Sequence, residues 1–400
     1  MKITPRLRFS LLLLTALLLA RTTQAAEIPP AAQKYFVYVG SYTAKTDSKG
    51  IYLFEFATDT GKLIEKGLAA ETADPSWVAI DPSGKVLFAA NESGKASTIS
   101  AFSIERKTGK LSLLNKLPAH GEDPCYLSFD KTGKYLLVAN YSSGNIVVFP
   151  ILPDGKLGEK SATAKDAGSV GPNKERQDGP HAHWVELAKQ NDFAYVADLG
   201  LDRILVYRFD AAQGAIAPLY PSGDIPPDAA TGSEPLSVGL APASGPRHVV
   251  FSSDDKFMYV LGELSSTVSV FAKLGGGRFR PIQEISALPK EFTGRNDAAE
   301  IAILPNGKFL YASNRGQDAI AVFSIDPAKG TLTQIEDVPT GGKEPRNFVI
   351  DPTGQFLLAE NQNSNTIVEF KIDPSTGKLT PTGEIVKTPS PICIAFLPEP

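Results

Sequence analysis

The recurrence of one short sequence unit constrains the fold of this chain more than any other feature. In each copy, a short apolar run that usually starts with proline leads into a turn rich in glycine and aspartate, and a second apolar run then ends at asparagine, aspartate or glycine. A third apolar run and a weaker fourth one follow. Four short strands in a period of roughly 40–50 residues are typical of one blade of a β-propeller. The copies start at Pro75, Pro124, Pro180, Pro246, Ala298 and Pro345, and a half-copy starts at Pro391.

The two ends of the chain carry complementary parts of one further blade. Residues 392–397 are predicted to form only a first strand, whereas residues 35–39, 50–57 and 63–69 are predicted to form only the later strands. Pairing between the two ends would close the ring and remove its open edges. We therefore predict an all-β fold, a seven-bladed β-propeller whose ring is closed by the N-terminal strands pairing with the C-terminal strand. Residues 35–400 would form this single domain.

The N-terminus has the order of a secretory signal peptide, with basic residues, then an apolar run, then small residues. The apolar run from Phe9 to Ala20 is too short to remain as a membrane anchor. We expect a signal peptide over residues 1–25 that is cleaved near Ala25, a linker over 26–34, and a periplasmic or secreted protein without membrane attachment. Cleavage would change the net charge from −4 to −8, so nucleic acid is not an expected partner.

Cofactors and covalent cross-links are not indicated by the sequence. Cys125 and Cys393 are the only cysteines, and both fit apolar strand positions, which favours free buried thiols over the disulfide that export would permit. No nucleotide, haem or flavin fingerprint is present, so no cofactor is expected, and we expect a monomer.

A propeller brings the starts of its first strands and the turns after its second strands to one face. Adjacent strands lie about 5 Å apart, so Arg247 and Glu263 should meet there, at a solvent-filled mouth. The long connections 160–179 and 222–245 are expected to wall the same mouth. The polar residues at or beside these positions are His181, His183, Arg247, His248, Glu263, Glu300, Arg315, Arg346 and Asn347.

Several of these residues also have a purely structural explanation. His181 suits a strand start, and Arg247 with Glu263 would form an ordinary ion pair between strands. The spacing of His181 and His183 occurs in metal sites, but no carboxylate or cysteine cluster accompanies it, so no metal is expected. The gathering of arginine, carboxylate and imidazole at equivalent positions of neighbouring blades favours a receptor for an anionic, oxygen-rich small molecule.

The chain resembles the seven-bladed β-propeller lactonases, the family of bacterial 6-phosphogluconolactonase and of related carboxy-muconate cyclising enzymes. The resemblance covers Tyr35 to Pro398, and it implies that the active-site residues are His181, Arg247, Glu263 and Arg315. It is carried by Gly179-Pro180-His181, Gly245-Pro246-Arg247-His248, the segment from Glu263 to Val268, Glu300-Ile301 and Ser313-Asn314-Arg315.

The expected function is therefore an exported lactone hydrolase that opens a sugar-type lactone. His181 is the expected base because imidazole suits proton transfer near neutral pH, with Glu263 as the alternative base. Arg247 and Arg315 would bind the substrate anion or polarise its carbonyl. The substrate-binding residues would be His183, His248, Glu300, Arg346 and Asn347. Export leaves the phosphorylation of the substrate open, and a carboxylate-bearing muconolactone-type substrate or a non-catalytic binding propeller remain alternatives.

Overall fold

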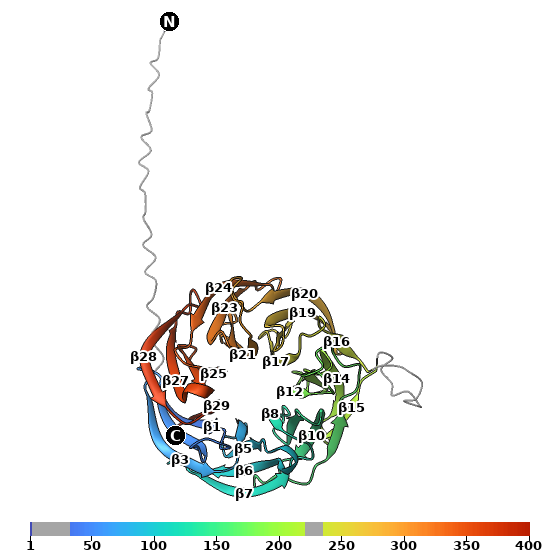
Figure 1. Cartoon of the computed structure of the whole chain (residues 1–400), viewed down its shortest axis with the longest axis vertical. Helices are drawn as coiled ribbons and strands as arrows, with labels where there is room; N and C mark the ends of the chain where they lie inside the picture. The colour runs from blue at the N-terminus through green and yellow to red at the C-terminus, as the bar shows by residue number, and fades with distance from the viewer. Residues whose placement is uncertain (2–32, 221–234) are drawn as a thin grey trace. The chain divides into compact units, whose positions relative to one another are not determined.

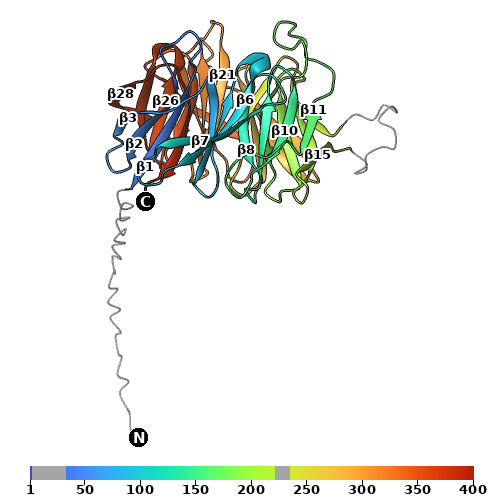
Figure 2. The same cartoon turned by 90° about the horizontal axis from the view of Figure 1, so that it is seen from below.

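A computed structural model describes Met1 and residues 33–220 and 235–400, and one compact unit spans Gln33–Pro400. Its seven antiparallel sheets are arranged as the blades of a ring (Figure 1). Figure 2 shows the same ring from the side. The predicted all-β, seven-bladed propeller is thus confirmed.

The blades are numbered here in chain order from the one that contains β1. Blade 1 contains β29 (Pro391–Pro398), β1 (Lys34–Ser41), β2 (Gly50–Ala57) and β3 (Leu63–Glu71). Blade 2 contains β4 (Pro75–Ile80), β5 (Val86–Asn91), β6 (Thr98–Ile104) and β7 (Leu111–Pro118). Blade 3 contains β8 (Pro124–Phe129), β9 (Tyr135–Asn140), β10 (Asn145–Pro150) and β11 (Ala162–Lys165). Blade 4 contains β12 (Ala182–Leu187), β13 (Phe193–Asp198) and β14 (Arg203–Asp210), with β15 (Ala215–Pro218) and β16 (Ser237–Gly239) both paired to β14.

The remaining three blades have the same antiparallel order. Blade 5 contains β17 (Pro246–Phe251), β18 (Phe257–Gly262), β19 (Thr267–Gly275) and β20 (Arg278–Ser286). Blade 6 contains β21 (Asp297–Ile303), β22 (Phe309–Arg315), β23 (Ala319–Ile325) and β24 (Leu332–Pro339). Blade 7 contains β25 (Pro345–Ile350), β26 (Phe356–Asn361), β27 (Thr366–Ile372) and β28 (Leu379–Lys387). The described residues also form two short 3₁₀ helices, η1 (Gly94–Ala96) and η2 (Gln362–Ser364).

Both chain ends build blade 1, as predicted. Strand β29 pairs antiparallel with β1, from Tyr35 opposite Pro398 to Ser41 opposite Pro391. This pairing closes the ring, and Figure 1 shows β29 and the other first strands nearest its centre.

The repeated turn between first and second strands is held by an aspartate. In blade 3, Asp130 Oδ1 accepts hydrogen bonds from the backbone amides of Lys134, at 2.7 Å, and Tyr135, at 2.8 Å. Its Oδ2 accepts a hydrogen bond from the amide of Thr132 at 3.0 Å. Gly133 adopts a φ of 69° in this turn, a conformation that favours glycine. The recurring sequence of aspartate, two residues, then glycine is therefore a turn signal rather than a functional motif.

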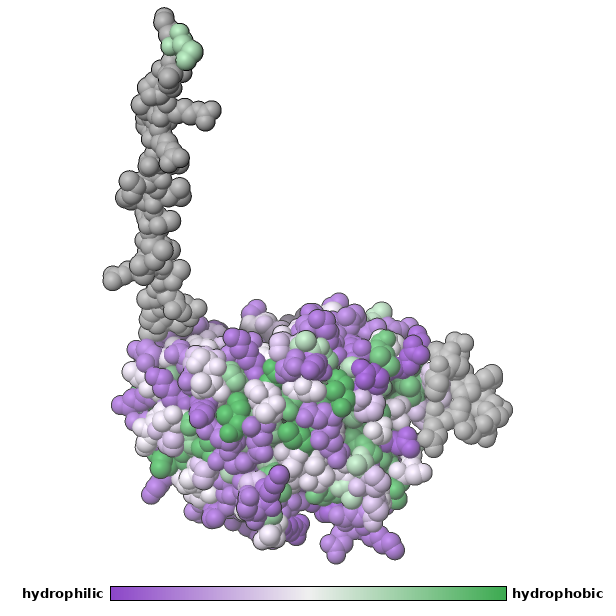
Figure 3. Space-filling view, turned by 90° about the horizontal axis from the view of Figure 1, so that it is seen from above, coloured by the Kyte–Doolittle hydropathy of each residue, from purple (hydrophilic) through white to green (hydrophobic). Residues whose placement is uncertain are grey.

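The core lies between the blades. Seven apolar clusters each join two neighbouring blades, as where Tyr259 of β18 packs with Leu310 and Phe323 of blade 6. Figure 3 shows that hydrophobic side chains on the outer edge of the ring are interspersed with hydrophilic ones. The alternating apolar residues of each strand are thus used to pack blade against blade.

A β-bulge at the start of the first strands positions the functional residues. The pairing register shifts immediately after Pro75, Pro124, Ala182, Pro246 and Pro345. A bulged residue is left out of the ladder, so its side chain can be aimed differently from its neighbours. The bulged residues in these blades are Ser76, Cys125, His183, Arg247 and Arg346, and Ile392 is left out in the same way after Pro391 in blade 1.

The predicted signal peptide and nearly all of the predicted linker lie outside the described residues, as does 221–234 of the connection 222–245. The division into residues 1–25, 26–34 and 35–400 stays a prediction. Within the described part of the chain, no helix has the length and apolarity needed to cross a membrane.

Candidate active site

Glu263 is the centre of a buried charge cluster at the end of β18. Its Oε2 lies 3.0 Å from Arg247 Nε and 3.1 Å from Arg315 Nη2, and its Oε1 forms an ion pair with Arg176. Burial alone would raise the pKa of Glu263, but Arg315, Arg247 and Arg176 outweigh this effect and lower the pKa to about 2. Glu263 is therefore an anion at any pH of interest.

The expected contact between Arg247 and Glu263 is present, but its environment differs from the expectation. Both residues are only 3% exposed, so the pair is buried rather than placed in a solvent-filled mouth. Burial together with Arg315 and Arg346 lowers the pKa of Arg247 to about 10, and the guanidinium stays charged at neutral pH. A buried ion pair is costly to break because the remaining charge has no compensation.

Arg176 is a site residue that the repeat pattern did not reveal. It lies in the irregular connection between β11 and β12, and its guanidinium also contacts Asp297 Oδ1 at 3.3 Å and the Tyr141 hydroxyl at 3.4 Å. An irregular connection has no position equivalent to those in other blades. The only sequence signal was the length of the connection 160–179, which was expected to wall the mouth.

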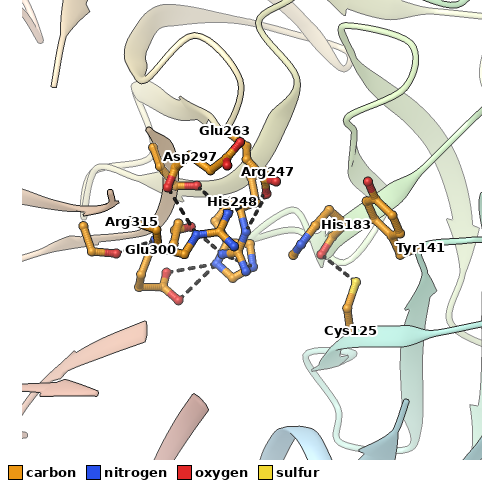
Figure 4. A network of polar contacts seen from close by, with 12 residues as sticks. Cys125, Tyr141, His183, Arg247, His248, Glu263, Asp297, Glu300 and Arg315 are labelled. Atoms are coloured by element: carbon orange, nitrogen blue, oxygen red, sulfur yellow. Dashed lines mark hydrogen bonds and ion pairs between the residues drawn. The ribbon is translucent and has the colours of Figure 1, made fainter. Parts of the chain in front are cut away.

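A cavity of about 260 Å³ opens beside this cluster, and we call it the arginine pocket. Figure 4 shows Arg247, Glu263, Asp297 and Arg315 in one group and Cys125, Tyr141 and His183 in another across the site. The lining residues of the arginine pocket are Tyr42, Glu92, Cys125, Tyr141, Arg176, His183, Glu263, Arg315 and Arg346. Of the residues selected from the sequence, it is lined by His183, Glu263, Arg315 and Arg346, and not by His181, Arg247, His248, Glu300 or Asn347.

His183, and not His181, occupies the position in blade 4 that is equivalent to Arg247. Ala182 pairs with Asp198, so Ala182 takes the place that proline has in the other blades, and the bulge falls on His183. Counting from Pro180 therefore selects a residue two positions too early. The pKa of His183 is lowered well below 6.5, mainly by burial and secondly by the nearby charge of Arg247. Its buried Nδ1 has no hydrogen-bond partner among the described residues.

His181 lies at the edge of the site. Its Nδ1 is 3.1 Å from the carbonyl oxygen of Tyr141, and its Nε2 is 2.8 Å from Asp178 Oδ1. The imidazole also stacks on the Tyr141 ring, with 4.6 Å between centroids. Both ring nitrogens thus face acceptors, which suits a donor that braces Tyr141 better than it suits a proton acceptor.

His248, Glu300 and Asn347 form a second polar layer next to the pocket. His248 Nδ1 lies 3.0 Å from Glu300 Oε1, and Asn347 Nδ2 donates to Glu300 Oε2 at 2.9 Å. The His248 ring contacts the His183 ring edge-to-face at 5.1 Å. The structure thus brings these three predicted residues together, but as a support for His183 rather than as pocket lining.

The cysteines are free and buried. Cys125 lines the arginine pocket, and its Sγ lies 3.5 Å from the carbonyl oxygen of His183. Burial raises the pKa of the Cys125 thiol, so a thiolate nucleophile is not favoured there.

Tyr42, Glu92 and Arg346 form the opposite wall. The Tyr42 hydroxyl donates to Glu92 Oε2 at 2.7 Å, and the Arg346 guanidinium lies 5.4 Å from the Tyr42 ring centroid. Counting from the lysine before the second strand selects Ser41 in blade 1, one residue before Tyr42. The segment from this lysine to the residue opposite the leading proline is one residue longer in blade 1, Lys34 to Ser41, than in blade 2, Lys85 to Asn91. Within the described residues, no group of three or more His, Cys, Asp or Glu side chains is placed to hold a metal ion.

Comparison with known proteins defines the class to which this fold and site belong. The family described as "Lactonase, 7-bladed beta-propeller" matches residues 36–396. The chain belongs to this family, and the predicted family and enzyme class are confirmed.

Three individual proteins are similar to this chain over most of its length. The chain is 36% identical over 315 residues to a 6-phosphogluconolactonase from Bacillus subtilis, covering 78% of this chain and 84% of that protein. A solved structure of a putative 6-phosphogluconolactonase from Bacteroides fragilis is 35% identical, with a TM-score of 0.82 over 91% of this chain and 98% of that one. The periplasmic gluconolactonase of Pseudomonas aeruginosa is 30% identical, with a TM-score of 0.83 over 92% of this chain and 100% of that one.

Proposed function

We propose that this protein is an exported hydrolase that opens a sugar-type lactone in the arginine pocket. The observation that carries the proposal is the Glu263 carboxylate held by three guanidinium groups in a pocket that Arg346 also lines. Guanidinium groups suit the carbonyl, carboxylate or phosphate oxygens of a lactone substrate.

The geometry suggests a division of roles in the hydrolysis. A water molecule attacks the lactone carbonyl carbon, the ring C–O bond breaks, and the alkoxide formed takes up a proton. Arg315 and Arg346 line the pocket and would stabilise the negative charge that develops on the carbonyl oxygen. Glu263 would fix the orientation of the guanidinium groups, because its low pKa makes it a weak base.

We assign the role of base to His183 in place of His181. His183 lines the pocket and is neutral near pH 7, since burial lowers its pKa well below 6.5. A neutral imidazole has one nitrogen lone pair that can accept the proton of the attacking water. Glu263 remains the alternative base.

Export and the nature of the substrate are supported by two independent observations. The N-terminal order of basic, apolar and small residues is that of a signal peptide, and one structural relative is a periplasmic gluconolactonase. We therefore propose an unphosphorylated sugar lactone as the substrate, met outside the cytoplasm.

A lactone panel tests this function. Residues 26–400 are incubated with glucono-δ-lactone, 6-phosphogluconolactone and a muconolactone, and acid release is measured against the spontaneous rate. We expect the protein to accelerate hydrolysis of the sugar lactones, with kcat/KM for glucono-δ-lactone at least equal to that for its phosphate ester. No acceleration with any lactone would favour a binding propeller, whereas a strong preference for the phosphate ester or the muconolactone would overturn the proposed substrate.

The pH dependence tests the assignment of the base. Glu263 keeps its charge above about pH 2, so it does not titrate in an assay between pH 4 and 7.5. His183 becomes protonated only well below pH 6.5, and kcat/KM should fall only there. An acidic limb centred at or above pH 6.5 would exclude His183 as the base. The depressed pKa of Glu263 stabilises the folded state fully above about pH 4.3, and this stabilisation is lost as pH falls towards 2. Protonation of Glu263 would therefore not unfold the protein in the assayed range and distort the dependence of kcat/KM on pH.

A further inference from the structure

A second cavity adjoins the arginine pocket on the same face of the ring. Its volume is about 450 Å³, and it shares Tyr42 and Glu92 with the arginine pocket. We call it the amide pocket. Its lining residues are Tyr42, Ala44, Thr46, Asp74, Glu92, Gln362, Asn363, Asn365 and Ser390.

The amide pocket is formed by connections of blades 7, 1 and 2. Asp74 precedes β4 and Glu92 follows β5, while Gln362 lies in η2 after β26 and Ser390 precedes β29. These are the strand starts and second-strand ends that also form the arginine pocket. The two cavities are therefore neighbours, and Tyr42 and Glu92 contribute to the lining of both.

The walls of the amide pocket are fixed by internal hydrogen bonds. Asp74 Oδ1 accepts hydrogen bonds from the amides of Thr43, at 2.7 Å, and Ala44, at 2.8 Å. Asn365 Oδ1 accepts a hydrogen bond from the amide of Ser390 at 2.8 Å. A wall held in this way presents its remaining polar groups in constant positions, which lowers the cost of ordering them around a ligand.

The chemistry of the amide pocket differs from that of the arginine pocket. Its lining includes three carboxamides, a phenol, two aliphatic hydroxyls and two carboxylates, and no lysine, arginine or histidine. Carboxamides and hydroxyls both donate and accept hydrogen bonds, and carboxylates accept them. Such a wall matches a neutral group that carries many hydroxyls, whereas the two carboxylates, Asp74 and Glu92, oppose a phosphate.

We infer that the amide pocket binds a sugar ring attached to the lactone, so that the substrate is a glycosylated aldonolactone. This inference rests on the proposed function. The lactone ring occupies the arginine pocket, and the glycosidic bond passes Tyr42, one face of which is covered by Arg346. Together the two cavities reach the several hundred cubic ångströms typical of ligand sites, which exceeds the need of a single sugar ring.

Two amide side chains provide the test. Among the described residues, the side chains of Gln362 and Asn363 form no hydrogen bonds, although both line the amide pocket and neither lines the arginine pocket. They are therefore available to a ligand, and replacing them removes no side-chain hydrogen bond among the described residues. Gln190 is an exposed glutamine outside both pockets, and Gln190→Ala is the matched control.

The experiment compares kcat/KM for glucono-δ-lactone with that for disaccharide aldonolactones joined by α-1,4 and β-1,4 bonds. We expect the unmodified protein to prefer at least one disaccharide lactone by tenfold or more, because binding energy remote from the reacting bond can lower the barrier. One neutral hydrogen bond corresponds to about fivefold, so Gln362→Ala/Asn363→Ala should lose about 10- to 30-fold on that substrate. The same double variant should hydrolyse glucono-δ-lactone at an unchanged rate.

The outcomes separate this inference from the function on which it rests. Hydrolysis of glucono-δ-lactone without any preference for a disaccharide lactone overturns the sugar subsite and leaves the lactonase intact. An equal loss on both substrates in the double variant overturns it as well, since the residues would then act on the arginine pocket. Failure to hydrolyse any lactone removes the proposed function itself.

Discussion

We expect Glu263→Gln to lower kcat/KM for the lactone by a factor of about 10²–10³ and to lower the free energy of unfolding by about 3–5 kcal/mol. The rate loss follows because Arg315, which would stabilise the developing oxyanion, would lose the carboxylate that orients it. The stability loss follows because a buried carboxylate is replaced by a neutral amide while buried guanidinium groups keep their charge. Urea unfolding and kcat/KM, measured on the same preparation at a temperature where the variant is folded, check both values.

Two further variants show whether the effects belong to the site. Glu369 of β27 is equally buried, but burial raises its pKa to about 7 and it lines neither pocket. Glu369→Gln should therefore keep its activity and most of its stability. Arg176→Ala leaves Glu263 paired with Arg247 and Arg315, so it should cost less stability than Glu263→Gln while lowering kcat/KM by about 10²-fold. Normal turnover in Glu263→Gln together with lost stability would assign the charge cluster to structure alone.

A chain that ends at Pro389 is expected to lose cooperative folding. This deletion removes β29, whose side chains Ile392, Cys393 and Leu397 are buried, and it leaves one edge of β1 without its partner. Burying one aliphatic side chain contributes about 1.5–3 kcal/mol, and the total stability of a domain is about 5–15 kcal/mol. The removed strand thus accounts for a large share of the total.

The truncation is measured by circular dichroism during urea and thermal unfolding. Deletion of only Glu399 and Pro400, which follow β29, is the control and should unfold with a single sharp transition. A chain ending at Pro389 that also unfolds sharply, at the same midpoint as the full chain, would show that the ring does not depend on this closure.

The fold could be predicted from the sequence because each blade repeats the same local signals. The aspartate turn, shown by Asp130, and the alternation of apolar residues act within one blade, where sequence distance and spatial distance agree. Closure could also be predicted, because a first strand at one end and later strands at the other leave only one way to pair all edges.

The site was predictable only where the repeat kept its register. Glu263, Arg315 and Arg346 follow the common pattern and line the pocket. Counting residues along the repeat selects His181 in place of His183, because Ala182 stands where the other blades have the leading proline. It also selects the residue before Tyr42 in place of Tyr42. The bulge recurs in these blades, so what differs is the spacing between the counted residue and the bulge, and no residue type marks that difference.

The contact of Arg176 with the site and the burial of Arg247 could not be predicted from the sequence for a different reason. Arg176 reaches Glu263 from an irregular connection, where no repeated position marks it. The exposure of Arg247 depends on how the neighbouring blades and this connection cover it. Both facts are properties of the assembled ring rather than of any one blade.

The pairing of β1 with β29 also limits when the ring can be completed. Tyr35 and Pro398 are partners, so this contact joins residues that lie far apart in the sequence, and closing such a long loop is slow. Until residue 398 has been synthesised, β1 has one open edge, and the ring is an incomplete array of blades. A chain that emerges from its N-terminus first therefore cannot complete the ring until its C-terminal strand has been synthesised. During this period the unpaired edge of β1 is exposed and can pair with other chains.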